Sequence, residues 1–158
     1  MSHIIFFRAP LVCPTTGSIV DGERPNVFTS SLNPDPMDID VERGEVIAIA
    51  LEDFADGYFT LRPPADDVRA LELWECSACN QDHWVVLAFE RVDDEHYRFV
   101  AADRAELSDA VLGSVHYVSR WMETWLPGLA EDERERLLAA LAPMFPPATL
   151  AKLSAREN

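Results

Sequence analysis

The chain has 158 residues, of which 48% are hydrophobic and 26% are charged. That length and composition suit a single domain spanning 1–158, and they exclude wholesale disorder. The longest apolar run, 46–51, is far shorter than the ~20 residues that cross a bilayer, so no membrane partner is expected. A formal net charge of −15 disfavours direct binding to nucleic acid or to an anionic membrane surface.

The first hundred residues are rich in predicted β-strands. Each segment is apolar or alternates in polarity, and Pro, Gly, Asn or Asp residues separate the segments. Asp56-Gly57 predicts a hairpin of 46–52 with 58–62, and the acidic turn 93–95 predicts a second hairpin. The alternation of apolar and acidic residues in 70–75 predicts a half-exposed strand. The predicted strands are 4–8, 27–32, 46–52, 58–62, 70–75, 83–92 and 96–101.

Helices are predicted for the rest of the chain. Apolar residues recur every three or four positions over about 105–126, and the first turn of a helix at 131–141 is acidic. A last short helix is predicted at 149–155. Together these elements predict an α+β fold, in which an antiparallel sheet of six to seven strands within residues 4–101 is followed by two or three C-terminal helices. The β-rich part is 1–102 and the helical part is 103–158. Trp121 and Trp125 lie one helical turn apart, which fits either a core or an interface.

The three cysteines form the most specific local pattern. Cys13-Pro-Thr-Thr-Gly17 and Cys76-Ser-Ala-Cys79-Asn80 each end on a residue that tolerates a positive φ angle, as a metal-binding knuckle requires. Thr16 stands where the first half would carry its second thiolate, and His83 follows Cys79 by four residues. A tetrahedral zinc site of Cys13, Cys76, Cys79 and His83 is therefore predicted, with a structural role because its ligand set is complete.

This pair of segments resembles small bacterial zinc-ribbon-like proteins, which combine a CPxTG half with a CPxCGxxHxW half. The resemblance covers about a dozen residues and departs from the pattern at Ser77, where Pro is usual, and at Asn80, where Gly is usual. It implies a knuckle that holds two hairpins together, and no reaction. A knuckle without metal is the alternative. The absence of a βαβ unit around the pair argues against thioredoxin-like redox chemistry, and free cysteines suit the reducing cytoplasm.

Acidic residues are concentrated in the first half of the chain. Residues 21–67 hold 12 acidic residues and three arginines. Such a surface accelerates association with a basic partner, although it also serves simple solubility. The sequence contains none of the G-x-S-x-G, P-loop, dinucleotide-binding or H-E-x-x-H motifs. The candidate partner-binding residues are Asp35, Asp38, Asp40, Glu42, Glu45, Glu52, Asp53 and Asp56.

The expected function is therefore that of a non-catalytic acidic binding protein that neutralises or regulates a basic protein partner. A bacterial toxin-immunity protein is one concrete form of it. A nucleic-acid mimic that inhibits its target, or a small metal-dependent enzyme, are the alternatives.

Overall fold

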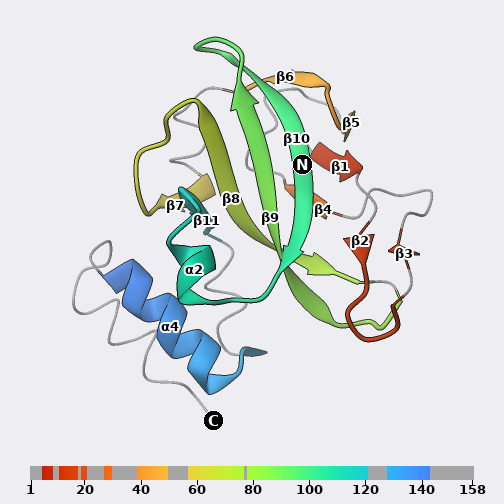
Figure 1. The fold of residues 1–158 in the computed structure, drawn as a ribbon, viewed down its shortest axis with the longest axis vertical. Coiled ribbons are helices and arrows are strands. Elements are labelled where there is room, and N and C mark those ends of the chain that lie inside the picture. The colour runs from red at the N-terminus through yellow and green to blue at the C-terminus, as the bar shows by residue number, and fades with distance from the viewer. Residues whose placement is uncertain are drawn as a thin grey trace.

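The computed structural model describes residues 5–8, 11–17, 19–20, 27–29, 39–49, 57–76, 78–120 and 128–142. They form an α+β fold built on a mixed six-stranded sheet (Figure 1). Its strand order is β6 (Val46–Ala48), β10 (His96–Ala105), β9 (Asp82–Arg91), β8 (Asp67–Glu75), β11 (Tyr117–Ser119) and β7 (Tyr58–Thr60).

Two smaller sheets and two helices complete the described fold. A three-stranded sheet has the order β4 (Val27–Thr29), β1 (Ile5–Arg8) and β5 (Ile39–Glu42), and β2 (Leu11–Val12) pairs with β3 (Ile19–Val20). The helices are α2 (Asp109–Leu112) and α4 (Glu131–Leu141). In the part of the chain that the structure describes, neither helix has the length and apolar character needed to span a membrane.

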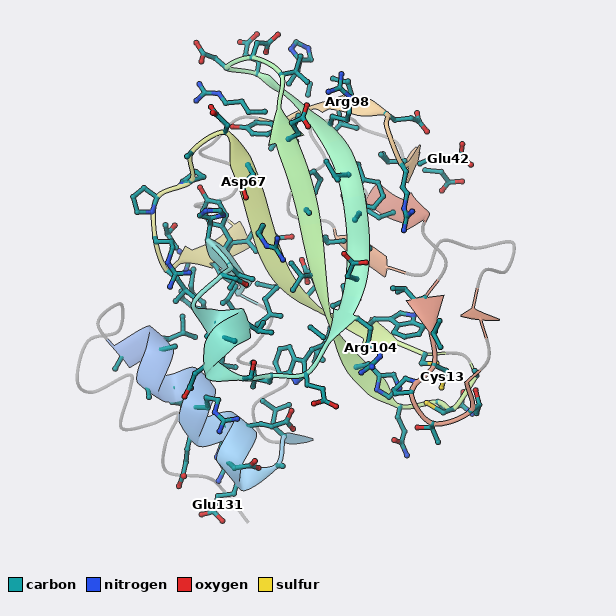
Figure 2. The ribbon with its side chains drawn as sticks, viewed as in Figure 1. Cys13, Glu42, Asp67, Arg98, Arg104 and Glu131 are labelled. Atoms are coloured by element: carbon teal, nitrogen blue, oxygen red, sulfur yellow. The ribbon has the colours of Figure 1, made fainter. Side chains whose placement is uncertain are left out.

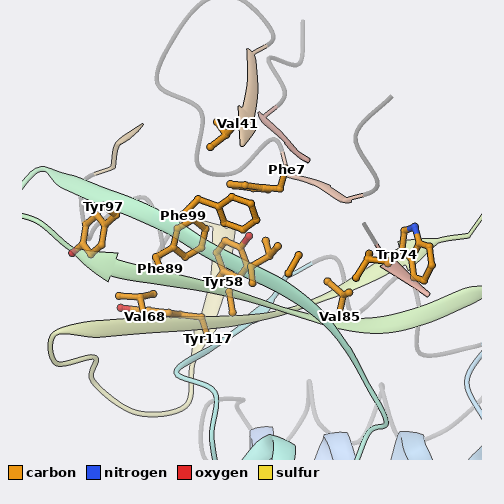
Figure 3. Packing of buried hydrophobic residues seen from close by; sticks show 14 of the residues in the cluster. Phe7, Val41, Tyr58, Val68, Trp74, Val85, Phe89, Tyr97, Phe99 and Tyr117 are labelled. Atoms are coloured by element: carbon orange, nitrogen blue, oxygen red, sulfur yellow. The ribbon is translucent and has the colours of Figure 1, made fainter. Parts of the chain in front are cut away.

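The central sheet is buried on both faces because its longest strands carry apolar residues at successive positions. On β9, Val85, Leu87 and Phe89 face one core, while Trp84 and Val86 face another. The three-stranded sheet covers the first core, where the Phe7 ring lies 5.5 Å from the Phe89 ring and 4.9 Å from the Phe99 ring (Figure 3). Helices α2 and α4 cover the second core with Leu112, Leu137, Leu138 and Leu141.

Several sequence predictions are confirmed. The hairpin of 83–92 with 96–101 is formed by β9 and β10, and the helix at 131–141 is α4. Strands 4–8 and 27–32 correspond, in their described residues, to β1 and β4. Each of these elements follows from a local signal, namely an acidic turn, an acidic first helical turn or a short apolar run.

The predicted helix over 105–126 is wrong in its described part, 105–120. Strand β10 continues to Ala105, α2 spans four residues, and β11 follows at Tyr117–Ser119. The Ser108 side chain accepts a hydrogen bond from the Val111 N–H and so caps α2. Val115 and Val118 are nevertheless buried with Leu112, so the apolar spacing of a helix is fulfilled by a turn and a strand.

Strand β11 also makes the sheet mixed, whereas an antiparallel sheet was predicted. It pairs parallel to β8 and antiparallel to β7. The Arg62 guanidinium holds the turn between α2 and β11 in place by donating hydrogen bonds to the carbonyl oxygens of Leu112 and Val115. The part after residue 102 is consequently not all helical. Residues 121–127 and the helix predicted at 149–155 lie outside the described residues.

The predicted hairpin of 46–52 with 58–62 is wrong in its described residues, 46–49 and 58–62. Strands β6 and β7 lie at opposite edges of the six-stranded sheet, where β6 pairs with β10 and β7 pairs with β11. Their partners come from much later in the chain, so the Asp56-Gly57 signal was overridden by non-local pairing. The strand predicted at 70–75 is confirmed as part of β8, but its predicted half-exposure is wrong, because Ala70, Leu71, Trp74 and even Glu72 are buried.

Candidate metal centre

Two loops with the same backbone geometry bring the cysteines together. After β2, the Gly17 N–H donates to the Cys13 carbonyl oxygen at 2.8 Å, and after β8 the Asn80 N–H donates to the Cys76 carbonyl oxygen at 2.8 Å. Gly17 and Asn80 have φ angles of +75° and +59°, in the left-handed region that Gly and Asn tolerate best. The two cysteine loops therefore have equivalent backbones, as the sequence predicts, and Thr16 occupies the position in the first loop that Cys79 has in the second.

All four predicted ligands meet at these loops. One ligand atom from each of Cys13, Cys76, Cys79 and His83 lies within 4.8 Å of all the others, and the Cys79 Sγ to His83 Nε2 distance is 3.2 Å. Ligands of a tetrahedral zinc ion are separated by roughly 3.5–4 Å, given Zn–S and Zn–N bonds of about 2.3 and 2.0 Å. Three thiolates and an imidazole are a donor set that suits zinc, and the four residues can bind a metal ion.

The ligands come from segments far apart in the sequence. Cys13, which is labelled in Figure 2, follows β2. Cys76 and His83 lie at the adjoining ends of β8 and β9. Trp74 pairs with His83 across the two strands, and their rings lie 5.6 Å apart, which limits where the imidazole can turn. A metal ion here would cross-link the start of the chain to the central sheet.

The buried thiols differ in their electrostatics. Hydrogen bonds from the Thr16 side chain, and lesser ones from the backbone of Thr16 and Thr15, lower the pKa of Cys13 to about 6 against the opposing effect of desolvation. Burial raises the pKa of Cys76. Thiolate is the form that binds metal, so the loop around Cys13 already supports one anionic ligand.

A cleft of about 740 Å³ adjoins the metal centre. It lies between the two knuckle loops and the start of α4, where the Trp84 Nε1–H donates to Glu133 Oε2 at 2.9 Å. Through this cleft solvent reaches the side of the centre that carries His83. The side chains lining it include Pro14, His83, Trp84, Arg104, Leu107 and Glu133.

Three of the candidate partner-binding acids are described, and all three are exposed. Asp40 and Glu42 lie on β5, and Glu45 lies in the turn before β6, where its Oε1 accepts a hydrogen bond from the Glu42 N–H at 2.8 Å. Asp35, Asp38, Glu52, Asp53 and Asp56 lie outside the described residues, as do Trp121 and Trp125.

Asp66 and Asp67, which the sequence also suggested for an acidic contact surface, lie at the same end of the sheet, and sequence analysis missed the acids of β9 and the β9–β10 turn beside them. Asp67 pairs with Glu90 across β8 and β9, and the β9–β10 turn adds Asp93, Asp94 and Glu95. We call the exposed acidic side chains of this end the acidic rim. Its described members are Asp40, Glu42, Glu45, Asp66, Asp67, Glu90, Asp93, Asp94 and Glu95.

Sequence analysis also missed the buried carboxyl group of Glu72. Its side chain is 4% exposed, and its Oε1 accepts a hydrogen bond from the Tyr58 hydroxyl. The acid lies between Ala70 and Trp74 on the same face of β8, so it points into the first core. The sequence signal for this residue was the position of Glu72 in an alternating apolar and acidic segment. That alternation was interpreted as solvent exposure of the acidic side chain.

Comparisons of the chain with protein-family models, curated proteins and solved structures found no match.

Proposed function

We propose that this is a non-catalytic binding protein of the cytoplasm that engages a basic protein partner through its acidic rim, on a body stiffened by a structural zinc ion. The observation that carries the proposal is the convergence of Cys13, Cys76, Cys79 and His83 from two loops that are 63 residues apart in sequence. A metal with four protein ligands serves as a cross-link.

The complete ligand set supports a structural role over a catalytic one. Catalytic zinc sites keep one coordination position for water or substrate, and they are usually held by three protein ligands. Here three thiolates and one imidazole can fill all four positions of a tetrahedral ion. The cleft beside His83 is the feature that favours the alternative of a metal-dependent enzyme, and it would have to bind a substrate next to the ion.

The charge distribution supports a basic partner. The acidic rim has nine carboxylates, and four arginines lie within three residues of its members in the sequence, namely Arg43, Arg69, Arg91 and Arg98. Arg91 pairs with Asp94 and Arg98 with Glu90, and carboxylates still outnumber arginines in the described part of the rim. A field of one sign at one end of a rigid sheet steers an oppositely charged protein toward that end.

The proposal is tested by reversing charge at two places. A rim variant, Glu42→Lys/Asp66→Lys/Glu95→Lys, changes exposed residues for which no side-chain hydrogen bond or ion pair is described. A control variant, Asp103→Lys/Glu106→Lys/Glu135→Lys, makes the same change in net charge away from the rim. Each zinc-loaded protein is used to capture partners from an extract of the native host at low and high salt.

We expect the wild type and the control to retain a basic protein at about 50 mM salt and to release it at about 500 mM, since screening weakens contacts between exposed charges. The rim variant should not retain that protein. Equal retention by the rim variant, or capture of only neutral or acidic proteins, would overturn the proposal. Capture of a DNA-binding protein that competes with duplex DNA would instead support the nucleic-acid mimic.

A further inference from the structure

The three thiols of the metal centre differ in their exposure to solvent. Cys13 and Cys76 are 0% and 2% exposed, whereas Cys79 is half-buried and lies between exposed Ala78 and Asn80. Asn80 and His83 also line the cleft beside the centre. A small oxidant in solution therefore meets the Cys79 sulfur first, because the other two thiols are buried and oxidation depends on solvent access.

A second thiol lies within reach of Cys79. All the ligand atoms of the centre lie within 4.8 Å of one another, so the Cys76 sulfur lies no farther than that from the Cys79 sulfur. A disulfide requires a sulfur–sulfur distance of about 2.05 Å, and the Cys-x-x-Cys spacing is one that forms disulfides in redox proteins. To form the Cys76–Cys79 disulfide, the two sulfurs need to move closer only within the turn that carries both cysteines.

We propose that Cys79 is a site of reversible oxidation, at which hydrogen peroxide converts the Cys76–Cys79 pair to a disulfide and expels the bound metal. This inference rests on the proposed zinc centre. It concerns a modification of the protein itself and differs from the thioredoxin-like catalysis that the sequence argues against.

The chemistry balances with one peroxide. The Cys79 thiolate attacks one peroxide oxygen, the O–O bond breaks, and the departing hydroxide takes up a proton to leave as water. The Cys76 thiolate then attacks the sulfur of the resulting sulfenic acid, the S–O bond breaks, and a second hydroxide leaves as water with a second proton. The two sulfurs supply the two electrons that reduce the peroxide.

The metal loses half of its ligands in this reaction. Cys13 and His83 remain, and one thiolate with one imidazole is too few donors to hold zinc tightly. The cross-link between the Cys13 loop and the β8–β9 end is then lost. Because Pro14 of that loop forms part of the cleft wall, oxidation would loosen the wall without cutting the chain.

The test uses the full chain loaded with zinc. The protein is titrated with hydrogen peroxide while a chromogenic chelator reports free zinc, and samples are denatured, alkylated and mapped by mass spectrometry. We expect zinc release to accompany the loss of two of the three thiols, with Cys13 as the one that remains alkylated. A thiol reductant with added zinc should restore the starting state.

Two variants separate the roles of the thiols. Cys13→Ser keeps the Cys76–Cys79 pair and should still form the disulfide, whereas Cys76→Ser should accumulate the sulfinic or sulfonic acid of Cys79. Zinc retained under excess peroxide, or a disulfide that contains Cys13, would overturn the oxidation proposal alone. A wild type that binds no zinc at all would overturn the metal centre, and the expulsion step with it.

Discussion

The Tyr58 hydroxyl donates a hydrogen bond to the Glu72 carboxyl group within the core between the central sheet and the three-stranded sheet. Burial raises the pKa of Glu72 from 4.5 to about 8, an effect larger than the lowering by the hydrogen bonds from Tyr58 and Ser119. The folded protein therefore keeps a proton at neutral pH that the unfolded chain releases.

Replacing this acid should change how stability depends on pH. Between about pH 4.5 and 8 the folded state binds more protons at Glu72 than the unfolded state, so the free energy of unfolding falls as pH rises. Glu72→Gln keeps the shape and cannot ionise. We expect the variant to match the wild type near pH 4.5 and to be more stable by roughly 3 kcal/mol near pH 7, as measured by urea unfolding.

The control for this measurement is Glu90→Gln, an exposed acid on the neighbouring strand that pairs with Arg98 at 2.9 Å. It should change stability by less than about 1 kcal/mol at every pH, as for other surface ion pairs. Parallel pH profiles for Glu72→Gln and the wild type would show that Glu72 is ionised in the folded protein.

Removing the imidazole ligand should abolish tight zinc binding. For His83→Ala we expect at least about 100-fold weaker zinc affinity, since a structural site needs its full ligand set. In the wild type, chelation of zinc should lower the melting temperature by about 10 °C, which corresponds to about 3–5 kcal/mol for a chain of this size. Competition with a metal indicator and thermal scans measure the two quantities.

The matched control is His96→Ala, whose imidazole is half-buried near the β9–β10 turn and lies 2.8 Å from an Asp93 carboxylate oxygen. This variant should bind one equivalent of zinc with unchanged affinity. Weakened binding in both histidine variants would mean that zinc affinity follows general stability instead of ligation by His83.

The equivalence of the two loops predicts a rescue. Thr16 stands where Cys79 stands in the other loop, and its side chain already contacts the Cys13 thiol. Thr16→Cys in the His83→Ala background should therefore restore zinc binding with four thiolates. Cobalt substitution should show stronger thiolate-to-metal charge transfer than in the wild type, because a fourth sulfur joins the metal. Thr15→Cys, one residue away, should not rescue.

The positive φ of Gly17 should make this position intolerant of a side chain. Gly17→Ala has open space around the added carbon, so its cost arises from the backbone alone, at about 1–2 kcal/mol. Gly128→Ala also meets open space, and no positive φ is present there, so stability should change by less than about 0.5 kcal/mol. Equal effects in chemical unfolding would contradict the role assigned to the Gly17 turn.

The sequence by itself determined the elements that depend on neighbouring residues. The β9–β10 hairpin follows from an acidic turn between two apolar runs, and α4 follows from its acidic first turn and its leucines. The knuckle loops follow from Cys, Gly and Asn at fixed short spacings, because a tight turn and a positive φ are local properties. His83 could be assigned to the centre for the same reason, since it lies four residues from Cys79.

Tertiary structure alone decided the pairings between distant segments. An apolar period of three to four residues over 105–120 fits a helix, but the same residues are buried as a short turn and a strand that adds parallel to β8. Likewise β6 pairs with β10 and β7 pairs with β11, both much later in the chain, and the two strands do not pair with each other. The buried position of Glu72 depends on hydrogen bonds from Tyr58 and Ser119, which lie on other strands. Such contacts between strands cannot be predicted from the residue spacing within a single segment.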